Sequence, residues 1–183
     1  RSAVTTQALH PNFQGHFDEV IARNPGEREF HQAVYEVMQS LSPIAGRVGL
    51  RISPLVAYND IADSDPAGLV RHVAAEFERR GAAFFELRHN QHDDPAELEL
   101  ARIARATLHK VPLLRNGGYT AASGEADLAA GLADAIVYGK PYIANPDLVE
   151  RFRRGAPLNA VDFATLYVGG TKGYTDYPPL SGT

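Results

Sequence analysis

The chain has 183 residues, of which 44% are hydrophobic and 22% are charged, and its formal net charge is -4. This length suffices for one domain with a hydrophobic core, whereas a complete β/α barrel typically needs about 250 residues. The acidic balance and the lack of a basic tract argue against a nucleic-acid partner. Because the chain contains no cysteine, disulfides, thiolate nucleophiles and cysteine-ligated zinc are excluded. No apolar run approaches the roughly 20 residues of a membrane helix, so we expect a soluble cytoplasmic protein without a membrane partner.

From residue 45 onward, short β-rich runs alternate with helix-length amphipathic stretches, a pattern that predicts βα units and a parallel sheet. The four expected strands cover 48–53, 83–87, 111–114 and 135–138. The helices expected after them cover 66–80, 94–108, 124–131 and 145–152. Residues 1–44 differ, because one amphipathic helix over 27–41 is their main feature. We therefore expect a single domain, 1–183, made of an N-terminal helical segment (1–44) and a βα part (45–183).

The carboxyl ends of the expected strands are unusually polar, and in β/α arrangements these ends carry the active site. Two glycine-containing stretches there predict a phosphate site, because glycine N–H groups and a lysine can surround an anion. Its residues are Gly117, Gly118, Gly139 and Lys140. The alternative interpretation is a set of turn glycines and a solvated lysine.

Two further groups of charged residues lie at the strand ends. Arg51 interrupts an apolar strand, which is costly unless the charge is used, either on a ligand or in an ion pair with Glu86 of the next strand. Glu86, Arg88 and His89 form the densest charged cluster, where a histidine near a carboxylate can act as a general acid or base. The alternative is a solvated polar loop. The spacing of the histidines matches no established metal motif, so no metal is expected.

Four phrases along the chain carry a family resemblance. They are RVGLRISP (47–54), NGGYT (116–120), AIVYGKPYIANPD (135–147) and GYTDYP (173–178). Together they resemble the C-terminal half of the old yellow enzyme family, flavin-dependent ene-reductases built on an eight-fold β/α barrel. No segment resembles the family's N-terminal half. The resemblance therefore implies an α/β fold that is a partial (β/α)8 TIM barrel, a half-barrel of about four βα units with an extra N-terminal helical segment.

The same resemblance implies a cofactor and a reaction. FMN is the implied cofactor, with Gly117, Gly118, Gly139 and Lys140 at its phosphate and Arg51 beside the flavin ring. Tyr167 stands where the family has an aromatic residue near the substrate. The implied reaction is reduction of an activated alkene (an enone), with NAD(P)H as the reductant. The chain departs from the family at Lys140, where arginine is usual, and at Val168, which alters the phrase that contains Tyr167.

Because a half-barrel lacks the family's residues for the substrate carbonyl and for proton delivery, three functions stay open. The first is an ene-reductase completed by a second copy or by a complementary N-terminal half-barrel chain. The second is a cofactor-free isomerase or cyclase with the catalytic candidates Tyr167, Glu86, Arg88 and His89. The third is a non-catalytic half-barrel that binds a ligand or a protein. A homodimer or a heteromeric partner is expected, since a half-barrel leaves open sheet edges that proteins normally cover, and residues 1–44 are the alternative cover.

Overall fold

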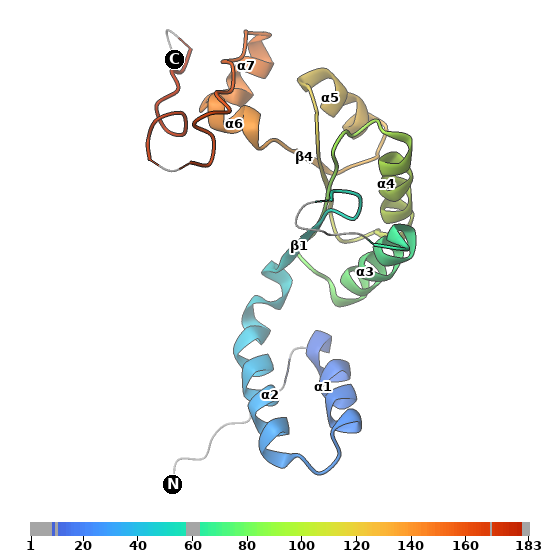
Figure 1. Ribbon diagram of the computed structural model, residues 1–183. Helices are drawn as coiled ribbons and strands as arrows, with labels where there is room; N and C mark the ends of the chain where they lie inside the picture. The colour runs from blue at the N-terminus through green and yellow to red at the C-terminus, as the bar shows by residue number, and fades with distance from the viewer. Residues whose placement is uncertain (1–8, 10, 58–62, 169, 181–183) are drawn as a thin grey trace.

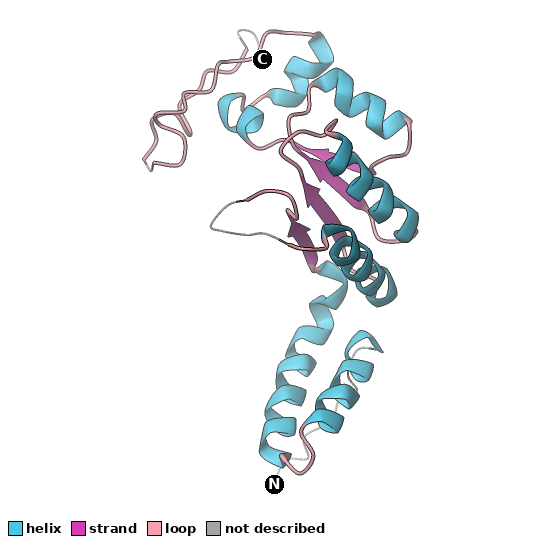
Figure 2. Ribbon diagram, turned by 45° about the vertical axis from the view of Figure 1, so that its right-hand side comes forward, coloured by secondary structure: helices cyan, strands magenta, loops and turns pink. Residues whose placement is uncertain are grey.

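The computed structural model describes residues 9, 11–57, 63–168 and 170–180, so residues 1–8 of the expected N-terminal segment lie outside the description. The elements are α1 (Pro11–Arg23), α2 (Arg28–Leu41), the 3-10 helix η1 (Ser42–Arg47), β1 (Gly49–Ile52), α3 (Pro66–Arg80), β2 (Phe84–Arg88), α4 (Pro95–Thr107), β3 (Leu113–Asn116), α5 (Ala121–Ala129), β4 (Ala135–Val137), α6 (Lys140–Ala144) and α7 (Leu148–Arg154). Figures 1 and 2 show α3, α4 and α5 along one side of the sheet and the α1–α2 hairpin projecting away from it. None of the helices in the described ranges combines the length and the apolar character that crossing a bilayer requires.

The sheet consists of four parallel strands in the order β1-β2-β3-β4. Its register places Arg51 of β1 beside Glu86 of β2, and Arg88 of β2 beside Asn116 of β3. The α/β class and the parallel sheet predicted from the sequence are thereby confirmed. Because all strands run in the same direction, their carboxyl ends meet at one end of the sheet, where the loops with the predicted site residues begin.

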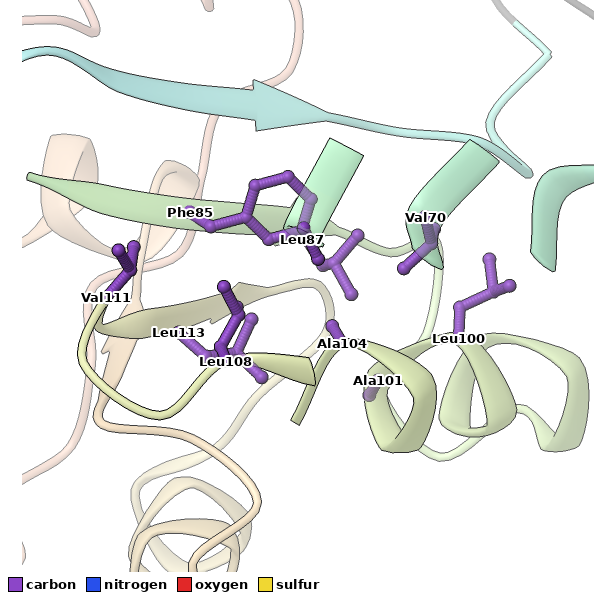
Figure 3. Close-up of a cluster of buried hydrophobic side chains, with 10 residues drawn as sticks. Val70, Phe85, Leu87, Leu100, Ala101, Ala104, Leu108, Val111 and Leu113 are labelled. Atoms are coloured by element: carbon purple, nitrogen blue, oxygen red, sulfur yellow. The ribbon is translucent and has the colours of Figure 1, made fainter. Parts of the chain in front are cut away.

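The hydrophobic core lies between the sheet and helices α3 and α4 (Figure 3). Phe85 and Leu87 of β2 and Leu113 of β3 have no exposed surface. They pack against Val70 and Ala74 of α3 and against Leu100, Ala101 and Ala104 of α4. Side chains alternate along a strand, so Glu86 and Arg88 face the opposite side of the sheet, away from these helices.

Some element boundaries differ from the prediction. β3 begins at Leu113, two residues later than expected, after a proline that has no N–H to donate to a neighbouring strand. α5 begins at Ala121 rather than at Gly124, because Thr120 and Ser123 form a capping box. Gly124 thus lies inside the helix, where a Cβ would sit 2.4 Å from the Tyr138 hydroxyl. α1, η1 and α6 were not predicted from the sequence.

Glu78, on the last turn of α3, stabilises the loop that leads into β3. Its carboxylate accepts hydrogen bonds at 3.0–3.1 Å from the backbone N–H groups of His109, Lys110 and Val111. Burial alone would raise the pKa of Glu78, but these donors outweigh that effect and hold the pKa below its ordinary value of 4.5. Because the pKa is lower in the folded state, this contribution to stability is present above pH 4.5 and is lost as the pH falls through the folded-state pKa.

We expect Glu78→Gln to lower the free energy of unfolding at neutral pH by roughly 1–2 kcal/mol, because a neutral amide accepts these hydrogen bonds less strongly. The variant should also flatten the decline in stability below pH 4.5, as measured by urea unfolding followed by circular dichroism. Glu99→Gln is the matched control, since Glu99 is exposed on α4 and its nearest cation, Arg102, is 3.9 Å away. Equal effects of the two substitutions would contradict this account of Glu78.

Candidate functional site

A cavity of about 410 Å³ lies at the carboxyl ends of the strands. Its volume falls within the range of about 300–1,000 Å³ that is typical of small-molecule sites. The predicted site residues that line it are Arg51, Arg88, His89, Gly117, Gly118, Gly139, Lys140 and Tyr167. The fold therefore gathers every predicted site residue except Glu86 around one space. Gln91, Tyr138 and Val161, which also line the cavity, were not singled out from the sequence.

Arg51 and Glu86 form an ion pair across β1 and β2. Arg51 Nη2 lies 2.8 Å from Glu86 Oε1, and the two side chains are 54% and 7% exposed, respectively. The ion pair with Glu86, which was one of the two roles expected for Arg51, is thus present. Because about half of the Arg51 side chain stays exposed at the cavity, the pairing leaves it accessible to a ligand. Glu86 is buried, so the solvated-loop alternative is wrong for this residue.

The Gly117–Gly118 turn packs closely against the loop that follows β2. Both glycines have positive φ, 135° and 69°. A Cβ on Gly117 would lie 2.4 Å from the His89 carbonyl oxygen, and one on Gly118 would lie 2.1 Å from Gln91 Oε1. Backbone conformation favours glycine at both positions, and at Gly117 the backbone of the neighbouring loop leaves no room for a side chain.

We expect Gly117→Ala to lower the free energy of unfolding by about 1–3 kcal/mol, because the new side chain meets backbone atoms in a conformation that L-residues rarely adopt. Gly139→Ala is a matched control in the wall of the same cavity. Gly139 has φ of -89° and no atom within 4 Å of an added Cβ, so a change within about 0.5 kcal/mol is expected. Thermal unfolding of both variants tests the difference, and equal losses would show that the close approach at Gly117 does not hold.

His89 is held in a buried network and uses both of its ring nitrogens. The Nδ1 atom lies 2.6 Å from Glu97 Oε2, and the Nε2 atom lies 3.3 Å from Arg115 Nε. Arginine Nε only donates, so Nε2 is the acceptor, and the single proton of the neutral ring is on Nδ1 and is donated to Glu97. The side chain of His89 is 2% exposed. Burial, followed by the nearby charge of Arg115, lowers the pKa of His89 to about 3.

Four residues of this network, Glu97, Arg115, Asp127 and Tyr119, were not among the predicted site residues. Arg115, with no exposed surface, donates from Nη1 to Asp127 Oδ2 at 2.5 Å, and Asp127 accepts from the Tyr119 hydroxyl at 2.6 Å. Burial, together with the Asp127 bond, raises the pKa of Tyr119, so its hydroxyl stays a donor. Asp127 comes from α5 and Glu97 from α4, the helices that follow the polar ends of β3 and β2. That position in the chain is the one sequence signal that could have indicated them as members of the site.

Lys140 and Tyr167 contribute the outer wall of the cavity. Lys140 is exposed at the start of α6, and its Nζ lies 5.1 Å from the centre of the Phe163 ring. Tyr167 is 67% exposed and has φ of 64°, the only positive φ of a non-glycine residue in the described ranges. Such a conformation is uncommon outside glycine and is found disproportionately at functional sites. Gly169, in the same phrase, lies outside the described residues.

The part of the chain that the structure describes contains no group of three histidine or carboxylate side chains placed to hold a metal ion.

Comparisons with known proteins find relatives for most of the chain. It is 40% identical over 147 residues to a putative 12-oxophytodienoate reductase 12 of Oryza sativa subsp. japonica, covering 74% of the chain and 36% of that protein. It is 38% identical over 147 residues to a probable flavin mononucleotide-dependent alkene reductase of Leishmania infantum, covering 79% of the chain and 40% of that protein. A scan against protein-family profiles finds no match.

Solved structures that resemble the chain are found as well. Morphinone reductase in complex with tetrahydroNAD superposes with a TM-score of 0.70 at 30% identity, over 98% of the chain and 46% of that structure. TcOYE with pHBA superposes with a TM-score of 0.69 at 30% identity, over 80% of the chain and 40% of that structure. The chain thus spans less than half the length of the relatives it matches. On these similarities of sequence and structure, the chain belongs to the old yellow enzyme family.

Proposed function

We propose that the chain forms the FMN-binding part of an oxidoreductase that reduces an activated alkene, an enone, with NAD(P)H as the reductant. The observation that carries this proposal is the cavity itself, which gathers three cationic side chains and two glycine-containing turns in an acidic protein. The cations are Arg51, Arg88 and Lys140. The names of the relatives agree with it, since one is a flavin mononucleotide-dependent alkene reductase and another was solved with tetrahydroNAD.

The donors around the cavity suit a flavin phosphate. We assign the phosphate to Lys140 and to the backbone N–H groups of Gly117, Gly118 and Gly139, because a cation and the backbone donors of glycine-containing turns are typical phosphate ligands and all four residues line the cavity. Arg51, which Glu86 holds in place, is assigned to the flavin ring. FMN would supply hydride transfer when bound. Tyr167 is assigned to the substrate side, where its exposed ring can contact an apolar alkene.

The buried network argues against the acid–base alternative. Both His89 nitrogens are engaged, and the ring is neutral at physiological pH, so it has no free site for proton transfer. Glu86 is likewise committed to Arg51. We therefore propose that His89 maintains the shape of the loop after β2 and that Arg88 contributes charge to the cavity wall.

We further propose that a second copy, or a chain with the complementary half-barrel, completes the site. Within the described residues β1 and β4 each have one strand neighbour, and parallel sheets are normally covered on both faces. A two-fold axis parallel to the strands would bring β4 of one copy alongside β1 of the other with all strands still parallel. Light scattering on the purified chain distinguishes the two arrangements, since a dimer mass supports the second copy and a monomer mass supports a separate partner chain.

The test of the proposed function is FMN retention. Purified protein incubated with FMN and then desalted should keep the visible absorbance of the flavin, and titration should give a saturable quench of flavin fluorescence. Lys140→Gln should weaken FMN binding about ten-fold through loss of a charged phosphate contact. It should leave riboflavin, which has no phosphate, unaffected.

Lys172→Gln is the control for this experiment, because Lys172 is exposed in the C-terminal tail and does not line the cavity. A protein that retains no flavin would overturn the assignment of FMN to this chain. Retention with equal effects of Lys140→Gln on FMN and riboflavin would overturn the phosphate assignment alone.

A further inference from the structure

Building on the proposed ligand cavity, we propose that Arg115 is the positioning residue of the site, which fixes the loops after β2 and β3 without touching the ligand. Arg115 is fully buried on the helix side of the sheet and does not line the cavity. Its influence on a ligand must therefore pass through the groups that it holds.

The guanidinium of Arg115 donates to three acceptors in two segments, the loop after β2 and helix α5. Nη1 donates to Asp127 of α5 at 2.5 Å, Nε donates to His89 at 3.3 Å, and Nη2 donates to the His92 carbonyl oxygen at 2.8 Å. A buried cation is tolerated only when its hydrogen bonds are made, so the energy of desolvating Arg115 is recovered only when both of these segments are in place. Only the planar fork of arginine can reach three such acceptors at once.

The partners of Arg115 extend its influence to the cavity wall. Glu97 accepts from His89 and, through its second oxygen, from the Asn90 N–H at 2.7 Å. Tyr119 binds Asp127 and stacks on the His92 ring, with ring centres 4.1 Å apart. The loop 89–92 and the turn 117–119 are thus connected through one buried cation. These two segments contribute His89, Asn90, Gln91, Gly117, Gly118 and Tyr119 to the cavity wall.

The chain contains a second arginine that serves as a matched control. Arg105 of α4 pairs with Asp134 at 2.7 Å and also donates to the Leu108 carbonyl oxygen. Its side chain is 25% exposed, and neither Arg105 nor Asp134 lines the cavity. Removing Arg105 breaks a similar arginine–aspartate pair without affecting the two loops, so the variants separate positioning from general loss of an ion pair.

The experiment compares wild type, Arg115→Met, Arg115→Lys and Arg105→Met by amide hydrogen exchange of the ligand-free protein and by FMN titration. We expect both Arg115 variants to exchange about ten-fold faster in peptides that cover 89–94 and 117–120, and to bind FMN about ten-fold more weakly. Arg115→Lys should not rescue either readout, because lysine keeps the charge but cannot make the three contacts. Arg105→Met should leave exchange in these peptides and FMN affinity at wild-type values.

Wild-type exchange in the two peptides of the Arg115 variants would overturn the proposal. So would rescue by Arg115→Lys, since the charge alone would then suffice. If wild type binds no FMN, the proposed function fails, and the exchange of the ligand-free variants decides the positioning role by itself. Should Arg115→Met not fold, Asp127→Asn removes the Arg115 ion pair more conservatively, and the same two peptides must exchange faster in it for the proposal to stand.

Discussion

Replacing Phe85 with alanine is expected to lower the free energy of unfolding by about 3–5 kcal/mol, the range for removing a buried aromatic ring from a packed core. Phe85 has no exposed surface. Its ring centre lies 5.9 Å from that of Phe77 of α3, and Figure 3 shows it among the side chains that join β2 to the helices. The cavity left behind cannot close easily, because the neighbours belong to regular strands and helices.

Urea unfolding followed by circular dichroism measures this loss. Phe163→Ala is the control with the same chemical change, since Phe163 is 69% exposed and a change within about 0.5 kcal/mol is expected. If the two substitutions cost the same, Phe85 is not part of a packed core. If Phe85→Ala does not fold at all, that result also agrees with the expectation. Phe85→Leu should then give a smaller decrease in the free energy of unfolding that can be measured.

Acidification below pH 6.5 is expected to destabilise the protein through His89, with a slope that rises to about 1.4 kcal/mol for each pH unit near pH 5. Burial, the charge of Arg115 and the nearby His92 and Arg88 lower the pKa of this histidine from 6.5 to about 3. The unfolded chain therefore takes up a proton in this range that the folded chain does not bind. The stabilisation by neutral His89 is complete above pH 6.5 and is lost as the pH falls toward 3.

The test is the pH dependence of urea unfolding in wild type and two histidine variants. His89→Gln should be less stable than wild type at neutral pH, but its stability should change little between pH 6.5 and about 5. His72→Gln should keep the wild-type slope, because His72 is exposed on α3. Carboxylates with a lowered pKa, such as Glu78, contribute below about pH 4.5. Burial raises the pKa of Glu97, so this carboxyl contributes above pH 4.5 with the opposite sign, and the difference in slope between wild type and His89→Gln is therefore the readout. A wild-type slope in His89→Gln would contradict the assignment.

Much of the βα part could be predicted because its signals are local. The bounds of α3, 66–80, were predicted correctly, since Asp65 caps the helix, Pro66 begins it and Gly81 ends it with φ of 62°. The gathering of site residues around one cavity was predictable too, because parallel strands bring their carboxyl ends together. α1 was missed although it is about as amphipathic as α3 and α4, which the sequence also marks by the capping residues Asp65 and Asp94.

The buried network could not be predicted, because its pairings depend on packing between elements. His89 was expected to lie near Glu86, which is three residues before it in the sequence. Its carboxylate partner is instead Glu97 of α4. Side-chain alternation explains the difference, since Glu86 and His89 lie on opposite sides of the sheet. Val149 shows the same limit, because its spacing predicted that it is buried together with Leu148 and Phe152, whereas its side chain is 65% exposed.

The two outer strands of the sheet are different strands, β1 and β4, and this difference restricts how copies can assemble. Pairing β4 of one copy with β1 of the next leaves another β4 unpaired unless the combined sheet closes, so in an open arrangement each added copy provides the edge for the following one. The addition of copies stops only where the combined sheet curves enough for β4 of the last copy to pair with β1 of the first copy. The curvature of the sheet, rather than the affinity of a single contact, would then decide between a closed ring of defined stoichiometry and an open filament.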